Sequence, residues 1–457
     1  MANQGCVWLC VLHVAQQLHS DPSSSRRLRQ AQQHQEAGDW LSAAAHYAAL
    51  AQLHPLDHRF LVNQGNALWL ADLPAAAHAV YLQASALDPD CPVARRGLAS
   101  CLRDLNRFEE AITLHQQLER LLEHSSADGL ANLWAHSQVL IGLERYGDAF
   151  QRMLWRRSWE AGPLEPTWDP LANRLTLTTE QGFGDSLQFV RFLLPLQHRR
   201  LAADRLGGVR LLVEPALVDL LREGLSWLVN PPEVLALATG SAHARAPRNA
   251  LSLLELPGAL GLEQLPEIRA DGSYLYSPRW NPQQPDLGAA RGLLQVGVVS
   301  EAGRPGADPF CQREFAKRSL PMPILWRLVS ELRARGAQIH DLQYGPEAIR
   351  HRALGLEPLS AGPGLTGFAA TARQAAGLDL VISVDTAMAH LMGSIGRTCW
   401  VLLPWSADPR WLRRGDGCPW YPRLRLFRQP RPGDWHGALD QLLECFTPIR
   451  FAQDRSP

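Results

Sequence analysis

Apolar residues in the first third of the chain recur at helical spacing, and the whole pattern repeats every 34 residues. Segments 38–40, 72–74 and 106–108 align, and each is followed at a fixed offset by a small residue and then a ring. The aligned residues are Ala43 and Tyr47, Ala77 and Tyr81, and Ala111 and His115, with Pro55 and Pro89 closing the first two units and a looser fourth unit at 143–149. A small residue lets two helices approach closely and a proline ends a helix, so the pattern predicts stacked antiparallel helix pairs.

These pairs are expected to form a short right-handed α-solenoid over residues 10–155, because each pair hides its apolar stripe only by stacking on its neighbours. The alternative is a generic helical bundle in which the spacing is accidental. A 34-residue period with a small residue, an aromatic and a closing proline at fixed positions resembles the tetratricopeptide repeat. The concave surface of such a solenoid usually holds a peptide or partner protein, and the groove residues do not identify one here.

The rest of the chain alternates short strands with helices. After a linker rich in Pro and Gly at 159–174, strands are expected at 174–179 and 209–215, each followed by a helix. A second set begins near residue 292, with strands expected at 293–300, 337–343, 379–384 and 398–404. Strand, helix and strand at this spacing indicate parallel βαβ units. We therefore expect two doubly wound domains at 174–285 and 290–450, with a substrate cleft between them.

Composition and charge narrow the class of protein. Hydrophobic residues make up 46% and charged residues 20%, which excludes a mostly disordered chain. The 45 basic and 45 acidic residues cancel, so bulk nucleic-acid binding is not expected. The 8 cysteines include no C-x-x-C pair and no zinc-finger spacing, so we expect no metal ligands and reduced thiols in a cytoplasmic protein. No apolar run is long enough to span a membrane, and the run at 6–15 lacks the basic start of a signal peptide.

The first candidate site is the turn "EQGFGDS" at 180–186, between an expected strand and an expected helix. Gly182 and Gly184 permit backbone conformations that other residues avoid, and they let a ligand approach the main chain. Asp185 is expected at the carboxyl end of the strand, where a carboxylate can accept a proton from a hydroxyl nucleophile. Alternatively, Asp185 only caps the following helix. The spacing is not G-x-G-x-x-G, so a dinucleotide site is not supported.

The second candidate site is 385–390, directly after the strand "DLVISV". A strand that ends in Asp385 and Thr386 and enters a helix presents backbone N–H groups and a positive dipole end, which suit a diphosphate. His390 follows one turn later, where its imidazole can donate to a phosphate or orient Asp385. The alternatives are a helix N-cap for Asp385 and a hydrogen-bonded core histidine for His390.

Two further clusters are weaker candidates. Lys317 and Arg318 lie within 315–320, which is expected to be a loop after the strand at 293–300. Basic residues in a loop facing the cleft can neutralise a pyrophosphate leaving group, although a solvated surface pair is an equal alternative. An aromatic cluster consists of Trp405, Trp411, Trp420 and Tyr421. These rings can stack on a sugar or base, but packing is the favoured reading for most of them.

These segments resemble a known family. The phrases "EQGFGDSLQFVRFLLPL", "RSLP", "LQYGPE" and "DLVISVDTAMAHLMGSIGRTCWVLLPWSADPRWL" are similar to bacterial tetratricopeptide-repeat proteins with a glycosyltransferase family 9-like domain. That domain is similar to the ADP-heptose:lipopolysaccharide heptosyltransferases. A repeat array before a two-lobed transferase also resembles the protein O-GlcNAc transferases at the level of architecture. The resemblance covers the repeats and most of residues 174–430.

The resemblance implies a GT-B fold, in which two Rossmann-like domains form an acceptor-side and a donor-side lobe. It implies a nucleotide-diphosphate sugar as donor, no essential metal or other cofactor, and inversion at the sugar carbon. Gly184 and Asp185 match the family's Gly-Asp pair, in which the aspartate is the proposed base. Asp385, Thr386 and His390 match its donor-phosphate motif, and Ala387 replaces a glycine that is usual there. The remaining implied nucleotide-sugar contacts are Gly182, Lys317 and Arg318.

The leading hypothesis is therefore an α plus α/β protein, with a helical-repeat solenoid followed by a GT-B pair, that transfers a sugar to a hydroxyl of a protein or glycan. The repeats would recruit the acceptor or a partner. Ala387 motivates an alternative, in which the chain is a non-catalytic interaction scaffold with a degenerate transferase domain. A third hypothesis is an accessory protein that binds sugar without transferring it.

Overall fold

In the computed structural model the chain forms two compact units. The first unit comprises residues 1–163, 304–317 and 406–413, and the second comprises 164–303, 318–405 and 414–457. The structure describes residues 21–124, 126–160, 169–205, 207–237, 250–280, 293–303, 308–345, 348–358 and 367–446. The predicted helix face at 6–15, the start of the predicted repeat domain and most of the predicted linker lie outside these ranges.

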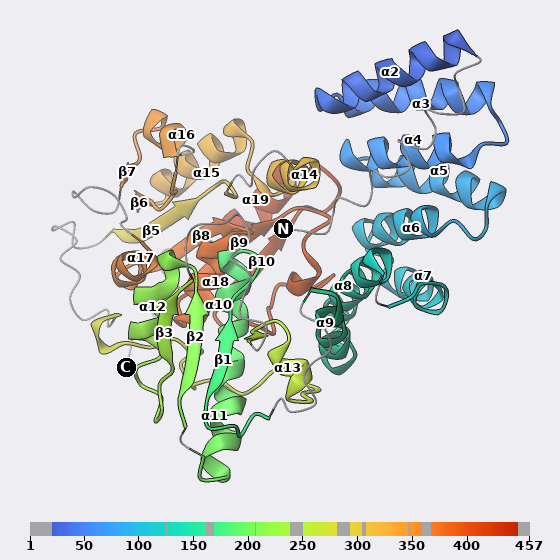
Figure 1. Ribbon diagram of the computed structural model, residues 1–457. Coiled ribbons are helices and arrows are strands. Elements are labelled where there is room, and N and C mark those ends of the chain that lie inside the picture. Colours follow the sequence, from blue (N-terminus) through green and yellow to red (C-terminus); the bar gives the residue numbers. More distant parts are fainter. Residues whose placement is uncertain are drawn as a thin grey trace. The chain divides into compact units, whose positions relative to one another are not determined.

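The first unit contains successive antiparallel helix pairs, coloured blue to teal in Figure 1. The helices are α2 (Pro22–Glu36), α3 (Trp40–Leu53), α4 (His58–Leu70), α5 (Pro74–Leu87), α6 (Pro92–Asp104), α7 (Phe108–Leu121), α8 (Ala127–Gly142) and α9 (Tyr146–Glu160). The second helix of each pair starts at 40, 74, 108 and 146, so the 34-residue spacing holds for the first three pairs and grows to 38 in the last, where α8 has 16 residues and α6 has 13. The predicted helical repeats are thus present.

The repeated small residues form the helix–helix contacts that the pattern predicted. Ala43, Ala77 and Ala111 are fully buried, and the rings four positions later are buried with them. The turn inside each pair needs one residue in the left-handed region, where φ is 74° at Gly38, 59° at Asp72 and Asn106, and 58° at Glu144. Short polar residues tolerate this conformation better than branched ones do, which accounts for Asp and Asn at two of these turns.

Two segments from the second half of the sequence belong to the unit that holds the repeats. They are residues 309–317 of α14 (Pro309–Arg318) and the whole of η5 (Pro409–Trp411). Within this unit the Arg313 guanidinium lies 4.4 Å from the centre of the Trp69 ring and donates to Asp104 Oδ2 at 2.8 Å. Trp69 Nε1 also donates to Asp104 Oδ2 at 2.8 Å, and Arg103 Nη2 lies 2.8 Å from Asp104 Oδ1. The side chains of Arg313 and Asp104 are each only 2% exposed, so this is a buried ion cluster.

A buried histidine in the repeats makes folding pH-dependent. Burial lowers the pKa of His115 to about 3, although its Nδ1 is held at 2.7 Å from Asn132 Oδ1, and the nearby His136 ring lowers the pKa further. Because the folded pKa lies below the unfolded value, the stabilisation is complete above about pH 6.5 and is lost as the pH falls toward 3.

Below pH 6.5 we expect this group to lower the free energy of unfolding by up to about 1.4 kcal/mol per pH unit. His115→Gln should flatten that slope in denaturant titrations run between pH 6.5 and 4, since the amide does not take up a proton. An unchanged slope in the variant would show that other groups carry the acid sensitivity.

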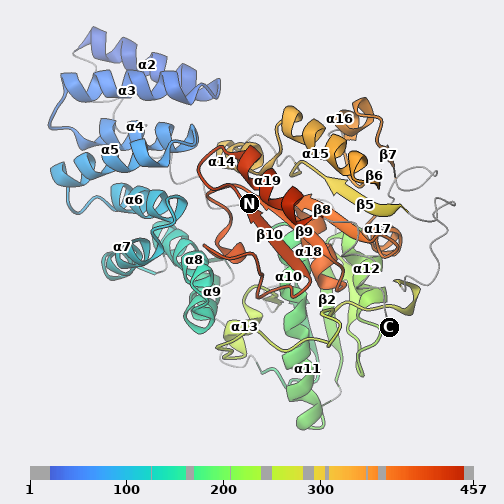
Figure 2. The same ribbon diagram turned by 180° about the vertical axis from the view of Figure 1, so that it is seen from behind.

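The second unit contains two parallel sheets, each with helices packed beside it (Figures 1 and 2). In the N-terminal lobe the strand order is β3-β2-β1-β4, with β1 at Leu175–Thr178, β2 at Val209–Val213, β3 at Glu233–Ala236 and β4 at Leu251–Ser252. Its helical segments are α10 (Phe183–Phe189), η2 (Val190–Phe192), α11 (Leu193–Ala202), η3 (Pro215–Leu217), α12 (Val218–Gly224), α13 (Leu256–Ala259) and η4 (Pro278–Trp280).

The C-terminal lobe has the strand order β10-β9-β8-β5-β6-β7, again with every described pair parallel. Its strands are β5 (Leu294–Val299), β6 (Ala337–Asp341), β7 (Glu357–Pro358), β8 (Leu380–Val384), β9 (Cys399–Leu403) and β10 (Leu424–Arg428). Its helices are α15 (Met322–Ala334), α16 (Ala348–Ala353), α17 (Phe368–Ala375), α18 (Ala387–Ser394) and α19 (Trp435–Cys445). Counted from β5, this is the doubly wound order 3-2-1-4-5-6 of dinucleotide-binding folds.

The predicted fold class, helical repeats followed by two Rossmann-like α/β domains, is therefore confirmed by the observed helices and sheets. The predicted domain limits of 10–155, 174–285 and 290–450 stay predictions, and the compact units differ from them in assigning 304–317 and 406–413 to the repeats. One local prediction is wrong: residues 315–318 are the last turn of α14 rather than a loop. None of the described helices is long and apolar enough to cross a bilayer.

Candidate functional site

Each of the two most specific sequence motifs follows a strand that lies beside the point where the strand order of its sheet reverses. In the N-terminal lobe the order changes between β1 and β4, and the turn at 179–182 leaves β1 there. In the C-terminal lobe the change lies between β5 and β8, and Asp385 directly follows β8. Open parallel sheets bind ligands at the carboxyl ends of strands at such switch points, so each motif occupies the position where its own lobe would hold a ligand.

Asp185 lies in the first turn of α10 rather than at the end of β1. Its Oδ2 accepts a hydrogen bond from the backbone N–H of Gly182 at 3.1 Å, and the residue is half-buried. The chain reverses before the helix through Gln181, whose φ is 67°. The capping role considered from the sequence is therefore present. The cap uses Oδ2 of the Asp185 carboxylate. A cap and a base are compatible roles for one carboxylate.

The turn that carries Asp185 and the helix that carries His390 lie against one another. A Cβ built on Gly184 would be 2.7 Å from His390 Cδ2 and 3.2 Å from His390 Nε2, so only glycine fits beside the ring. Helices α10 and α18 accordingly lie side by side, as both Figure 1 and Figure 2 show. The structure thus brings Gly184 and His390, two predicted site residues from different lobes, into direct contact.

His390 is almost completely buried, with 3% of its surface exposed. Its Nδ1 lies 2.8 Å from the hydroxyl of Tyr421, which packs in turn against Tyr274. Burial raises the pKa of Tyr421 well above its ordinary value, so the phenol stays protonated at neutral pH. Either ring nitrogen of His390 can carry the proton, and the Tyr421 contact orients the imidazole in both cases. The alternative considered from the sequence, a hydrogen-bonded core histidine, describes this environment correctly.

The start of α18 has the geometry of a capped helix. Thr386 is the N-cap, and its hydroxyl accepts from the backbone N–H of Met388 at 3.2 Å. The Asp385 side chain is buried, and Arg318 Nη1 lies 3.6 Å from its Oδ2 and 3.5 Å from its backbone oxygen. Thr386 and Ala387 are half-buried. Arg318 therefore lies beside the start of α18, and its contact with a donor phosphate stays a prediction.

Lys317 lies on α14, in the unit that holds the repeats. Its Nζ is 2.8 Å from Glu314 Oε1, and its side chain is 6% exposed. The neighbouring Arg318 belongs to the other unit, because the boundary between the two units falls between these two basic residues. The pairing with Glu314 is the structural role that the described contacts give to Lys317.

Arg191 is an important residue that the sequence analysis did not single out, although it lies inside a quoted motif. Its side chain is buried, and it donates to the carbonyls of Trp420 at 2.7 Å and Pro266 at 2.9 Å. The guanidinium also lies over the rings of Tyr274 and Trp420. Trp420 and Tyr421 are fully buried here, which confirms packing as the role of these two aromatics. A basic residue inside an apolar helical run was the available signal for Arg191.

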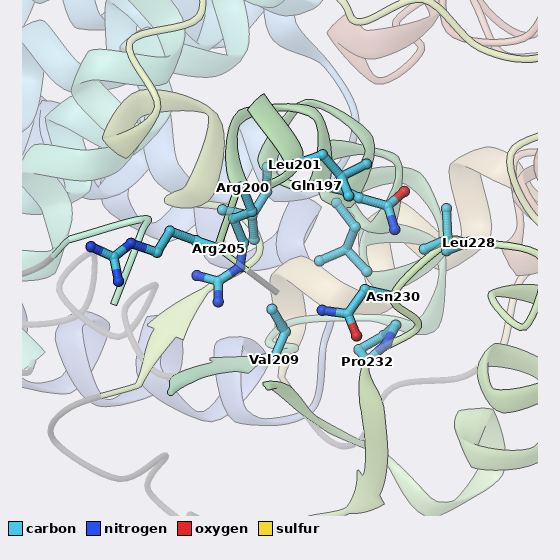
Figure 3. A pocket seen from close by; sticks show the side chains of 10 residues that line it. Gln197, Arg200, Leu201, Arg205, Val209, Leu228, Asn230 and Pro232 are labelled. Carbon is cyan, nitrogen blue, oxygen red and sulfur yellow. The ribbon is translucent and has the colours of Figure 1, made fainter. Parts of the chain in front are cut away.

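A separate hollow lies on the N-terminal lobe (Figure 3). It is lined by residues of α11 that include Gln197, and by Val209 of β2. The segment before β3 adds Leu228, Asn230 and Pro232. Arg200 lines it as well, but its guanidinium donates to the backbone carbonyls of Pro170, Ala172 and Gly207. None of the predicted site residues contributes to this hollow, so it is not part of the candidate site.

Sequence comparison finds no matching family model. Protein FlbA of Caulobacter vibrioides is 27% identical over 399 residues. The match covers 80% of this chain but only 63% of the length of FlbA, so the chain corresponds to part of that relative.

Three solved structures give a weak likeness of fold. They are ADP-heptose lipopolysaccharide heptosyltransferase II of E. coli (12% identity, 62% of this chain, 100% of that chain, TM-score 0.39), a family 9 glycosyl transferase of Veillonella parvula (12%, 62%, 97%, 0.42) and an O-GlcNAc transferase of Thermobaculum terrenum (16%, 95%, 92%, 0.34). These are the same classes of protein that the sequence motifs resemble. The fold assignment given above rests on the observed strand order.

Proposed function

We propose that the chain is a glycosyltransferase that moves a sugar from a nucleotide-diphosphate donor to a hydroxyl of a protein or glycan acceptor. The observation that carries this proposal is the contact between Gly184 and His390. It joins the motif with the candidate base to the motif with the candidate phosphate site, and both motifs follow the switch points of their sheets. The similarity of these motifs to family 9 glycosyltransferases supplies the reaction class.

In the proposed reaction Asp185 accepts the proton of the acceptor hydroxyl, and the acceptor oxygen attacks the anomeric carbon. The bond from that carbon to the diphosphate oxygen breaks, and the nucleoside diphosphate leaves with the electron pair. Attack opposite to the leaving group inverts the configuration of the carbon. A single carboxylate near the acceptor is all that this displacement requires as a base.

The leaving diphosphate needs positive charge and N–H donors. In the proposal these come from the start of α18, where Thr386 adds a hydroxyl, and from the guanidinium of Arg318. Gly182 and Gly184 add no side chains of their own to the turn that carries Asp185. The Nδ1 atom of His390 is engaged by the Tyr421 hydroxyl. Through this contact His390 would position the start of α18. A contact of Lys317 with the donor, and an independence of the reaction from metal, stay predictions.

The repeats would recruit the acceptor or a partner protein, as such arrays do. The described cysteines Cys91, Cys101, Cys311, Cys399, Cys418 and Cys445 are free thiols, which suits the reducing cytoplasm in which the proposal places the reaction.

Binding of a nucleoside diphosphate tests this proposal. UDP, GDP and ADP are added in turn to the full chain, and one of them should raise Tm in a saturable, concentration-dependent way. Thr386→Val should weaken that binding by about 10-fold, because the loss of one hydroxyl donor to a charged group costs about 1.5 kcal/mol or more. Thr113→Val, on the exposed surface of α7, is the matched control and should bind like the unaltered protein. If all three nucleotides leave Tm unchanged, the transferase proposal is wrong.

The non-catalytic scaffold is the second candidate, and three observations favour it. His390 is enclosed by Gly184 and Tyr421, and Lys317 is engaged by Glu314. In addition, Ala387 carries a methyl group at the start of α18, where a glycine would leave more room for a phosphate. A scaffold would bind none of the three nucleotides. An accessory sugar-binding protein would bind a nucleotide sugar without releasing the nucleoside diphosphate.

A further inference from the structure

Three side chains that commonly bind transition metals meet between consecutive helical repeats. His58 begins α4, Asp88 follows the end of α5, and Cys91 directly precedes α6. One ligand atom from each of these side chains lies within 4.8 Å of the other two, and His58 Nε2 is 3.4 Å from Asp88 Oδ2. Metal–ligand bonds of about 2.0–2.3 Å put neighbouring ligand atoms of a tetrahedral metal about 3.3–3.8 Å apart, and the His58–Asp88 distance of 3.4 Å falls in this range.

The backbone already orients two of these side chains. Asp88 Oδ1 accepts from the N–H of Asp90 at 3.1 Å, which directs Oδ2 toward His58. The N–H of Cys91 donates to the carbonyl of Asp88 at 3.3 Å, which holds the thiol beside the carboxylate. Cys91 is 7% exposed, whereas His58 and Asp88 are half-buried. The cluster thus has one sheltered sulfur and two ligands that a dissolved ion can reach.

The equivalent positions of the preceding repeat carry a different set of side chains. Positions 24, 54 and 57 correspond to 58, 88 and 91 by the 34-residue period. There Ser24 Oγ and His54 Nε2 form a hydrogen bond of 2.8 Å, and Asp57 caps α4 and pairs with Arg59. One step later than the cluster, Pro92 and Leu122 occupy the first two positions. The combination of nitrogen, oxygen and sulfur ligands is therefore specific to one junction among the described repeats.

We propose that His58, Asp88 and Cys91 bind a zinc ion at this junction, with water as the fourth ligand. A thiolate and an imidazole suit zinc and other late transition metals, whereas magnesium and calcium take oxygen ligands. On binding, the Cys91 thiol releases its proton to solvent and the thiolate bonds to the metal. The ion links α4, α5 and α6, and so fixes one repeat against the next. The sequence analysis expected no metal ligands because these three residues lack a recognised spacing.

Cobalt(II) is the probe for this site, because its thiolate complexes absorb in the near ultraviolet and four-coordinate cobalt absorbs strongly in the visible range. Titration of the full chain with cobalt should produce a thiolate-to-cobalt charge-transfer band that saturates at one ion per chain and disappears on adding zinc. Cys91→Ser should abolish the band. Serine is a good N-cap, and Cys91 makes no side-chain cap bond, so this variant should fold normally.

Two further variants and one control complete the test. His58→Gln and Asp88→Asn should each weaken cobalt binding by at least about 10–100-fold, the loss typical even for an outer-shell partner. Cys445→Ser, which alters a half-buried thiol in the other unit, should keep the full band. Far-ultraviolet circular dichroism verifies that each variant is folded. If the band is absent, or survives in Cys91→Ser, the proposal is wrong whether or not the chain transfers sugar.

Discussion

Replacing Asp104 by alanine is expected to lower the free energy of unfolding of the repeat-containing unit by about 3–5 kcal/mol. Burial alone would raise the pKa of the Asp104 carboxyl, but Arg103 and Arg313 overcome this and hold it well below its usual range. The variant removes the partner of Arg103, leaves the buried Arg313 with only Asp72 and Glu314, and loses the acceptor of Trp69 Nε1. Removal of one partner from a buried ion cluster is among the most costly local defects in a folded protein.

Denaturant unfolding followed by tryptophan fluorescence measures this loss. Asp148→Ala is the matched control, since the Arg145–Asp148 pair is about half exposed and should cost no more than about 1 kcal/mol. A double variant, Asp104→Ala with Arg313→Met, should recover part of the loss, because the second change removes one of the two buried guanidinium groups that Asp104 neutralised. If Asp104→Ala costs no more than Asp148→Ala, the cluster does not stabilise the unit as described.

The second large effect is on turnover. We expect Asp185→Asn to reduce kcat/KM for sugar transfer by about 10²–10⁴-fold, the usual contribution of a general base. Asparagine has the same shape, and its amide oxygen can still accept from the N–H of Gly182. The variant should therefore fold and bind nucleoside diphosphate as the unaltered chain does, and lose only the capacity to take a proton.

Release of nucleoside diphosphate from a panel of nucleotide sugars, with and without candidate acceptors, gives the rates. Asp219→Asn is the control, because Asp219 also lies in the first turn of a helix of the N-terminal lobe but is exposed. Its turnover should be unchanged. Equal turnover in Asp185→Asn and the unaltered chain would remove Asp185 from the mechanism.

The regular parts of the fold were predictable because their signals are local. The 34-residue period fixed the helix pairs, since the alanine positions that the period aligned are the buried contact points. Strands such as 379–384 read as mostly apolar runs, and β8 is buried along its whole length. Both features depend on residues close together in sequence, where spacing alone identifies the buried face.

The helix α14 was missed because its reason for being helical lies elsewhere in the chain. Its sequence, "PFCQREFAKR", has a weak apolar face, and the segment is stabilised by Arg313 and Phe310 against Trp69 and Asp104 of the repeats. Those partners are more than 200 residues away in sequence. Spacing within a segment carries no information about such contacts, so the segment looked like a loop with two basic residues facing a cleft.

The candidate site was predictable as two motifs but not as one place. Each motif could be assigned to the end of a strand from its own sequence. Their meeting depends on Gly184 fitting beside His390, on Tyr421 holding the imidazole, and on Arg191 joining α10's lobe to the carbonyl of Trp420. The glycine was noted for its backbone freedom, whereas its observed role is to leave room for an imidazole from the other lobe.

Hydrogen exchange of the full chain with and without the nucleoside diphosphate that binds tests the central claim most directly. If the turn after β1 and the start of α18 form one site, the ligand should slow amide exchange in both 180–189 and 385–394. The same ligand should leave the exposed helix α7 of the repeats unchanged. Protection confined to one of the two segments, or found in neither, would contradict a shared site for Asp185 and Thr386.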